Sequence, residues 1–259
     1  MLNRKIKRIK KYHNIGHIEN NFNNDKTPER IDALNPKDPW PTRWKYHHIY
    51  RYYLAKKYCK NKDVLDVGCG YGYGGFILSK VSRRVVGIDK DKGAINIAQE
   101  RYSQPNIDFL LMDATDIKLN NCFDTIVSFE NIEHIKNPES FLKKIPSLLK
   151  PNGLIIISTP NKKFTSGENP YHFNEYTYEG FEQLLKKYFQ NIRIEGEYLK
   201  SFLLYPVYFL ESFIPCLTLI PCILGKYFPK KSTVMIAICK NPIVGDNNLA
   251  IKRRRRKLV

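Results

Sequence analysis

Residues 64–75 read VLDVGCGYGYGG and combine a short apolar run, a carboxylate and a cluster of glycines. Because glycine lacks a Cβ, such a turn can bring backbone N–H groups directly against a ligand. Gly70 to Gly75 also fit the G-x-G-x-x-G dinucleotide pattern, which is a weak signal by itself. The stretch therefore predicts a strand, a ligand-binding turn and the start of a helix.

Asp66 narrows the kind of ligand. Strands of buried parallel sheets are mostly apolar, yet Asp66 stands inside the strand, two residues before the first glycine. A carboxylate there suits an ammonium or sulfonium group better than a pyrophosphate. Ordering of the turn's backbone, without ligand contact, is the alternative role for Asp66.

Two further acids end predicted strands. Residues 84–89 read as a strand ending in Asp89, which is placed to accept hydrogen bonds from two ribose hydroxyls or, alternatively, to cap the following helix. Residues 107–114 read as a third strand, and Asp113 could accept from an adenine amino group, with Asp116 as its rival. Ligands of open α/β sheets bind beyond the carboxyl ends of the strands, where we expect these acids to gather.

The elements that would position these acids alternate between strand and helix, which is typical of a parallel sheet of βαβ units. A helix before the first strand carries Ile49, Tyr53 and Leu54 on one face. Before that helix, the proline-rich residues 35–41 read as an extended arm or lid. The remaining predictions are strands over 123–129 and 154–158 and helices over 44–60 and 91–102.

Six motifs, in order, resemble the class I S-adenosylmethionine-dependent methyltransferases. The similarity is greatest to the methyltransferase-11 group, which includes quinone-biosynthesis, small-molecule and glycan methyltransferases. It covers roughly residues 46–198. The motifs are VLDVGCG at 64–70, GID at 87–89, MDA at 112–114, FDTIV at 123–127, EHI at 133–135 and LKPNG at 149–153.

The resemblance implies a fold. That fold is a Rossmann-like, doubly wound α/β domain with a seven-stranded sheet and a final antiparallel strand. The sixth strand would lie at about 192–198 and the seventh at about 233–239, with an apolar helical insertion between them. Pro146 departs from the family pattern, because it could kink or end the helix before the fifth strand.

The resemblance also implies S-adenosyl-L-methionine as the cofactor. Its methionine part would follow the glycine turn, Asp89 would bind its ribose, and Asp113 with Ala114 would border its adenine. The complete set of expected cofactor-binding residues is Asp66, Gly68, Cys69, Gly70, Asp89, Lys90, Asp113, Ala114 and Phe129.

Two histidines are the candidate catalytic residues. His134 follows the fourth strand and His172 the fifth, so both are expected beyond the carboxyl ends, where the methyl acceptor would sit. Histidine titrates in the range where a general base is useful, and the resemblance includes a histidine at each position. A structural hydrogen bond within its own loop is the alternative for each. The resemblance implies that the helix over 44–60 covers the cofactor and offers His47, His48 and Arg51 as contacts to the cofactor carboxylate or the acceptor. The alternative is that its aromatic residues only pack and that Arg51 is a surface charge.

The composition limits the classes of protein to which the chain can belong. The 259 residues suit one α/β domain with additions, and six cysteines without C-x-x-C spacing predict a reducing compartment, no disulfide framework and no metal site. The net charge is +18, and 12 of these charges lie in two acid-free tails, residues 1–12 and 252–257. Such tails can hold nucleic acid or an anionic membrane, or can be merely solvated. Nothing near the start resembles a signal peptide, so a cytoplasmic location is expected.

Residues 202–225 are apolar and contain one charge, Glu211. Their length suits a membrane span, but three prolines and the pairing of the flanking strands argue against a single crossing. Three interpretations stay open: broken helices at the membrane interface flanked by lysines, an apolar lid or acceptor pocket, or an extra packing layer or dimer face. The flanking lysines are Lys200, Lys226, Lys230 and Lys231.

Together these observations predict an N-terminal basic tail and arm (1–43), a methyltransferase domain (44–240, insertion 199–231) and a basic C-terminal tail (241–259). The expected acceptor is a small molecule, a glycan or a lipid-linked molecule, methylated at oxygen on the strength of the resemblance, with peripheral membrane contact through 202–225 and the tails. The alternatives are an RNA methyltransferase that uses the basic tails and a non-catalytic membrane or partner scaffold. A nicotinamide-dependent oxidoreductase rests on the glycine pattern alone.

Overall fold

The computed structural model describes residues 30–119, 123–165, 169–199, 204–211 and 213–243, and all structural statements concern these residues. The two basic tails singled out by composition lie outside this part of the chain.

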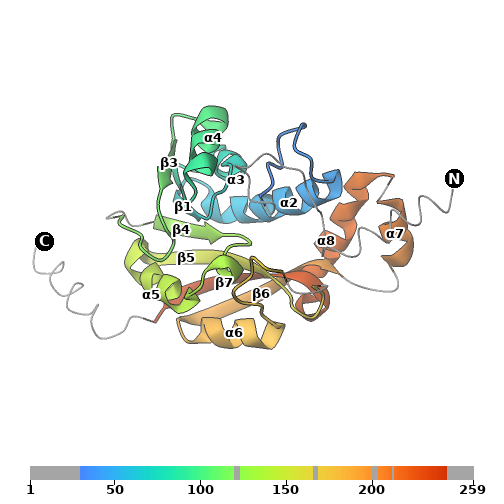
Figure 1. The fold of residues 1–259 in the computed structure, drawn as a ribbon. Helices are drawn as coiled ribbons and strands as arrows, with labels where there is room; N and C mark the ends of the chain where they lie inside the picture. Colours follow the sequence, from blue (N-terminus) through green and yellow to red (C-terminus); the bar gives the residue numbers. More distant parts are fainter. Residues whose placement is uncertain (1–29, 120–122, 166–168, 200–203, 212, 244–259) are drawn as a thin grey trace, which may run out of the picture.

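A seven-stranded sheet in the order β3-β2-β1-β4-β5-β7-β6 runs through the molecule (Figure 1). Strands β1 to β5 are parallel, and β7 is antiparallel to both of its neighbours, β5 and β6. This arrangement confirms the predicted Rossmann-like sheet with a final antiparallel strand. The strands are β1 Asp63–Val67, β2 Arg84–Asp89, β3 Ile107–Leu111, β4 Phe123–Ser128, β5 Leu149–Pro160, β6 Phe189–Leu199 and β7 Ser232–Pro242.

Helices cover both faces of the sheet. Neighbouring residues of a strand point to opposite faces, so Val64 joins the core with α2, α3 and α4, whereas Leu65 joins the core with α5 and α6 (Figure 1). The helices are α2 Thr42–Cys59, α3 Tyr73–Ser79, α4 Lys92–Tyr102, α5 Pro138–Leu148, α6 Tyr178–Lys186, α7 Tyr205–Leu210 and α8 Leu219–Gly225. The 3₁₀ helices are η1 Ile132–His134, η3 Pro215–Thr218 and η4 Pro229–Lys231.

Helix α5 continues past its proline. Asn137 caps its start by accepting a hydrogen bond from the Ser140 backbone N–H, and Pro146 lies inside the helix, which runs on to Leu148. Pro146 therefore does not end the helix, and it lies away from the carboxyl edge of the sheet.

The buried face of α2 agrees only in part with the predicted one, because Ile49 and Leu54 pack against the core and Tyr53 does not. Tyr53 is 59% exposed, although its apolar character placed it on the inner face. The hydropathy pattern does not predict which residues of α2 are buried, because polar side chains of this helix are buried against a carboxylate of β6. The buried residues are His47, Arg51, Tyr52, Ala55 and Cys59.

The insertion between β6 and β7 contains α7, η3, α8 and η4, and it extends beyond the sheet beside α2 (Figure 1). Within the described residues, no helix combines the length and the hydropathy that a bilayer crossing requires. The insertion is therefore a group of short helices, as the prolines predict.

Candidate functional site

The turn between β1 and α3 carries three glycines in the left-handed region, with φ of 76° at Gly68, 53° at Gly70 and 86° at Gly72. A Cβ added to Gly68 would lie 2.6 Å from Asn131 Cγ, but a Cβ added to Gly70 would meet no atom within 4 Å. Gly70 thus faces open space, and its backbone is the part of the turn that a ligand can approach.

Asp66 lies beneath this turn and is fully buried. The Tyr52 hydroxyl donates weakly to its carboxylate, at 3.3 Å from Oδ2, and the described residues supply no cation within ion-pair distance. Burial raises the pKa of Asp66 to about 7. An unpaired buried carboxylate is costly, so this site favours a ligand that brings a positive charge.

Asp89, at the end of β2, has both carboxylate oxygens occupied. Oδ2 accepts from the Gly70 N–H at 2.9 Å, and Oδ1 accepts from the Asp91 N–H at 3.0 Å and from Arg30 Nη2 at 2.8 Å. The cap of α4 is Asp91, whose side chain accepts from the Ala94 N–H. Asp89 therefore joins the glycine turn to β2 rather than capping the helix.

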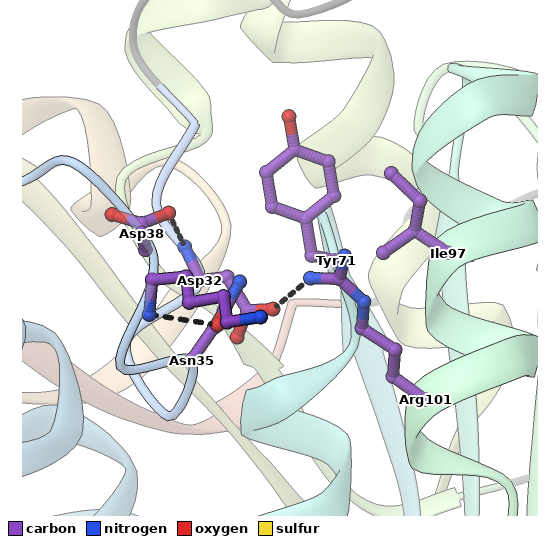
Figure 2. Close-up of a pocket in the computed structure, with 7 residues that line it drawn as sticks. Asp32, Asn35, Asp38, Tyr71, Ile97 and Arg101 are labelled. Carbon is purple, nitrogen blue, oxygen red and sulfur yellow. Dashed lines mark hydrogen bonds and ion pairs between the residues drawn. The ribbon is translucent and has the colours of Figure 1, made fainter.

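Arg30 belongs to an arm, residues 30–41, that folds over α4 as a series of turns instead of the predicted extended segment. Asp32 anchors it by accepting from the Tyr102 hydroxyl at 2.5 Å and from Arg101 Nη1 at 2.9 Å. Figure 2 shows Arg101 reaching Asp32 across a small polar pocket beside Tyr71. The arm thus closes over the ribose end of the expected cofactor site.

The residues expected at the adenine lie beyond the ends of β2 and β3. Lys90 is exposed and Ala114 half-buried. Asp113 Oδ1 accepts from the N–H and the hydroxyl of Thr115, at 2.7 and 2.6 Å, and these hydrogen bonds lower the pKa of Asp113. Its rival Asp116 is exposed and pairs with a neighbouring lysine at 2.9 Å. Asp113 is consequently an ionised acceptor in an ordered turn.

Cys69 and Phe129 shape the same site without reactive chemistry. Burial raises the pKa of the Cys69 thiol well above its usual range, so it stays protonated. Phe129 is buried at the end of β4, and its ring meets Tyr52 edge-on at 5.0 Å between centroids.

His134 and His172 come together at the carboxyl edge of β4 and β5. The backbone N–H groups of Phe173 and Asn174 donate to the Glu133 carbonyl, at 2.9 and 3.2 Å, and so tie the two loops together. The two imidazole centroids are 4.9 Å apart, and the rings are nearly perpendicular. The structure thus unites the two candidate catalytic residues, 38 positions apart in the sequence.

The hydrogen bonds distinguish the two rings. His134 Nδ1 lies 2.9 Å from the Tyr171 carbonyl oxygen, which can only accept. Nδ1 therefore carries the proton of neutral His134, and Nε2 carries the lone pair. His172 Nε2 accepts from Asn169 Nδ2 at 3.1 Å, a hydrogen bond within its own loop. The two rings therefore differ in which nitrogen is the acceptor and in which loop holds them.

Glu133 is a site residue that sequence reasoning missed. It is 1% exposed, and neither carboxylate oxygen makes a hydrogen bond with the described residues. Burial and the nearby Glu130 raise its pKa well above the usual range. One ligand atom each of Glu133, His134 and His172 lies within 4.8 Å of the others, a set that could hold a divalent cation. Its signals in the sequence were its adjacency to His134 and its place in the EHI motif at 133–135.

A buried ion-pair network connects α2 with this edge. Arg51 Nε donates to Glu197 Oε2 at 2.5 Å, His47 Nδ1 lies 2.9 Å from Glu197 Oε1, and Arg51 Nη2 is 3.9 Å from Glu130. Arg51 Nη1 is buried without a hydrogen-bond partner among the described residues. This guanidinium could receive the carboxylate of a ligand, whereas His48 contacts the Tyr73 hydroxyl at 3.1 Å.

Comparisons with known proteins agree with this geometry. Residues 59–201, more than half of the chain, match the family described as a methyltransferase domain. The chain is 32% identical over 167 residues to a probable S-adenosylmethionine-dependent methyltransferase of Mycolicibacterium smegmatis, covering 62% of this chain and 63% of that protein. It is 34% identical over 114 residues to a ubiquinone biosynthesis O-methyltransferase of Pelagibacter ubique, covering 43% and 48%. The chain thus spans less than two thirds of the length of these curated relatives.

The fold recurs in solved structures. The N-methyltransferase NodS of Bradyrhizobium japonicum, in complex with S-adenosyl-L-homocysteine, superposes with a TM-score of 0.56 over 85% of this chain and 94% of its own, at 16% identity. At that identity the likeness concerns the fold alone. The family match, together with the glycine turn and its acids, makes this chain a member of the methyltransferase-domain family, the class I enzymes that use S-adenosylmethionine.

Proposed function

We propose that the protein transfers the methyl group of S-adenosylmethionine to an oxygen of a small-molecule, glycan or lipid-linked acceptor. The observation that carries the choice of oxygen is the bond between His134 Nδ1 and the Tyr171 carbonyl. This bond makes Nε2 the acceptor nitrogen of a half-buried ring at the carboxyl edge, where ligands of such sheets bind.

The residues fit the proposed cofactor. Gly70 offers open backbone, and Asp66 offers a buried carboxylate to the ammonium or sulfonium charge. Asp89 Oδ2, which accepts a hydrogen bond from the Gly70 N–H, keeps acceptor capacity for a ribose hydroxyl, whereas Oδ1 is shared with Arg30. When bound, S-adenosylmethionine supplies a methyl group on a sulfonium that reacts by in-line displacement. Because this donor is reactive, much of the rate comes from positioning the acceptor.

The need for a general base distinguishes hydroxyl acceptors from amine acceptors. A hydroxyl keeps a proton of high pKa that must leave as the methyl bond forms, whereas a neutral amine attacks without prior proton loss. In this structure, His134 Nε2 is suited to take that proton, and His172 packs edge-on against the ring and fixes its orientation. The O-methyltransferase name of the Pelagibacter relative supports the same choice.

The experiment measures S-adenosylhomocysteine formation with a panel of quinols, lipid-linked glycans and amines, using wild type, His134→Gln and His172→Gln. We expect His134→Gln to lower kcat about 10²–10⁴-fold with hydroxyl acceptors, the range for loss of a general base. The affinity for S-adenosylmethionine should not change, because His134 is remote from the glycine turn in sequence and belongs to another strand end. Matched losses in both variants, or turnover confined to amines, would contradict the proposal.

A further inference from the structure

The insertion between β6 and β7 exposes an unusual amount of apolar surface. Between residues 213 and 228, six large side chains are at least two fifths exposed, with values from 41% to 68%. We call them the apolar patch: Phe213, Ile214, Ile220, Ile223, Tyr227 and Phe228. Exposed apolar surface of this kind marks an interaction site.

The insertion presents positive charges and no negative charge on its surface. Glu211 is the only acid of residues 204–231, and it is 3% exposed because its carboxylate accepts from the hydroxyls of Tyr198, at 2.5 Å, and Thr218, at 3.0 Å. The segment therefore hides its negative charge and presents none to a partner.

Three lysines border the apolar patch. Lys226 and Lys231 have no carboxylate within ion-pair distance in the described part of the chain, and Lys230 pairs with Glu179 at 2.9 Å. Lysines beside exposed aromatic and aliphatic side chains are typical of surfaces that lie in the headgroup region of a bilayer.

We propose that the apolar patch docks on the interface of an anionic phospholipid bilayer, with its side chains among the acyl-chain ends and Lys226 and Lys231 at the phosphates. Charge complementarity favours an anionic bilayer as the partner of the apolar patch. A second copy of the chain would bring the same lysines toward each other, whereas an anionic headgroup layer neutralises them. The short, proline-interrupted helices suit a segment that lies in the interface and does not cross it.

Helix α8, which carries Ile220 and Ile223 of the apolar patch, contacts the buried network that reaches the carboxyl edge of β4. Cys222, on α8, has its sulfur 3.4 Å from His47 Nδ1, and His47 shares Glu197 with Arg51, which reaches Glu130. Docking through α8 would therefore hold the carboxyl edge of β4 close to the lipid surface. An acceptor dissolved in or attached to the bilayer could then enter the site from the membrane side.

The test is co-sedimentation of the full chain with vesicles of phosphatidylcholine alone and of phosphatidylcholine with phosphatidylglycerol. The patch variant is Ile223→Glu, and the matched control is Leu111→Glu on β3, because both side chains are 54% exposed and β3 is at the other edge of the sheet. Thermal melts establish that both variants fold. A Lys226→Gln/Lys231→Gln variant tests the charge.

We expect binding to the anionic vesicles that falls at least about tenfold in Ile223→Glu, is retained in Leu111→Glu, and weakens in the lysine variant and with added salt. Equal binding by Ile223→Glu and wild type would overturn the proposal and assign any binding to the basic tails. A concentration-dependent dimer that Ile223→Glu disperses, without vesicle binding, would overturn it in favour of a second copy. Vesicle binding needs no turnover, so its failure is separate from failure of the proposed methyl transfer.

Discussion

Asp66 and Asp89 face the same glycine turn but differ in what satisfies them. Asp89 already receives the Gly70 N–H, the Asp91 N–H and Arg30. From the described residues, Asp66 receives only the long hydrogen bond from the Tyr52 hydroxyl, and its pKa is raised to about 7 by burial. Asp89 thus ties the turn together, whereas the carboxylate of Asp66 has no cationic partner within ion-pair distance among the described residues.

The raised pKa of Asp66 gives a direction to the pH dependence of cofactor affinity. Below about pH 7 its carboxyl group is mostly protonated and must lose a proton before pairing with a cation, so affinity should rise with pH and level off above pH 7. We expect S-adenosylmethionine to bind more tightly at pH 8 than at pH 6, by up to about tenfold.

Calorimetry at several pH values checks this, with Asp66→Asn as the control. Asparagine has no carboxyl proton to lose, so the variant should bind weakly with a flatter profile. The ligand's own amino group titrates in both proteins and cancels in the comparison. The same pH profile in both proteins would remove Asp66 from cofactor recognition.

For individual residues, the sequence was informative where an acid or a glycine stands at the end of a predicted strand or in a turn. Asp66, Asp89 and the glycines were identified because strand ends and turns have local signatures. Glu133 was missed because its importance lies in burial beside His172, which comes from a distant loop. The roles of the predicted cofactor residues stay predictions until a ligand is measured.

Among the elements, the arm over residues 30–41 was the least predictable. Its prolines indicated a non-helical segment, but its course depends on Asp32 meeting Tyr102 and Arg101, 70 and 69 residues away. The consequence for function is that Arg30 occupies Asp89 Oδ1, one of the two oxygens a ribose diol would use.

We therefore expect Arg30→Met to strengthen S-adenosylmethionine binding, because the diol no longer competes with a charge-assisted hydrogen bond. The gain should be about tenfold, which corresponds to one such bond. Titration calorimetry of both proteins measures it, and Arg43→Met serves as a control arginine on α2. Weaker binding in Arg30→Met would mean that Arg30 supports the bound cofactor instead.

The strands themselves were predicted well, since alternating hydropathy and terminal acids are local. Strand β3 ends at Leu111, three residues before the predicted end, and so Asp113 and Ala114 lie in the following loop. The predicted inner face of α2 was right for Ile49 and Leu54, which pack against the core, and wrong for Tyr53, and a hydropathic pattern cannot foresee the partner that neutralises Arg51. Glu197, 146 residues later, makes that polar face the buried one.

At the scale of the whole molecule, the sheet brings three structural features to one side. Strand ends β1 to β3 supply the glycine turn and its acids, β4 and β5 supply the histidine pair, and the insertion before β7 adds the apolar patch. These segments are far apart in the sequence, so the order of their motifs was informative about the family. None of the motifs identifies the methyl acceptor.

The central claim is that this sheet edge binds S-adenosylmethionine through the glycine turn and its acids. Titration calorimetry of the full chain with S-adenosylmethionine, with NAD in parallel, tests it most directly, using wild type and Asp89→Asn. The account predicts saturable binding of S-adenosylmethionine, no binding of NAD, and an affinity at least about tenfold lower in the folded variant, for the loss of a hydrogen bond to a charged group. Binding of NAD in place of S-adenosylmethionine, or of neither ligand, would contradict it.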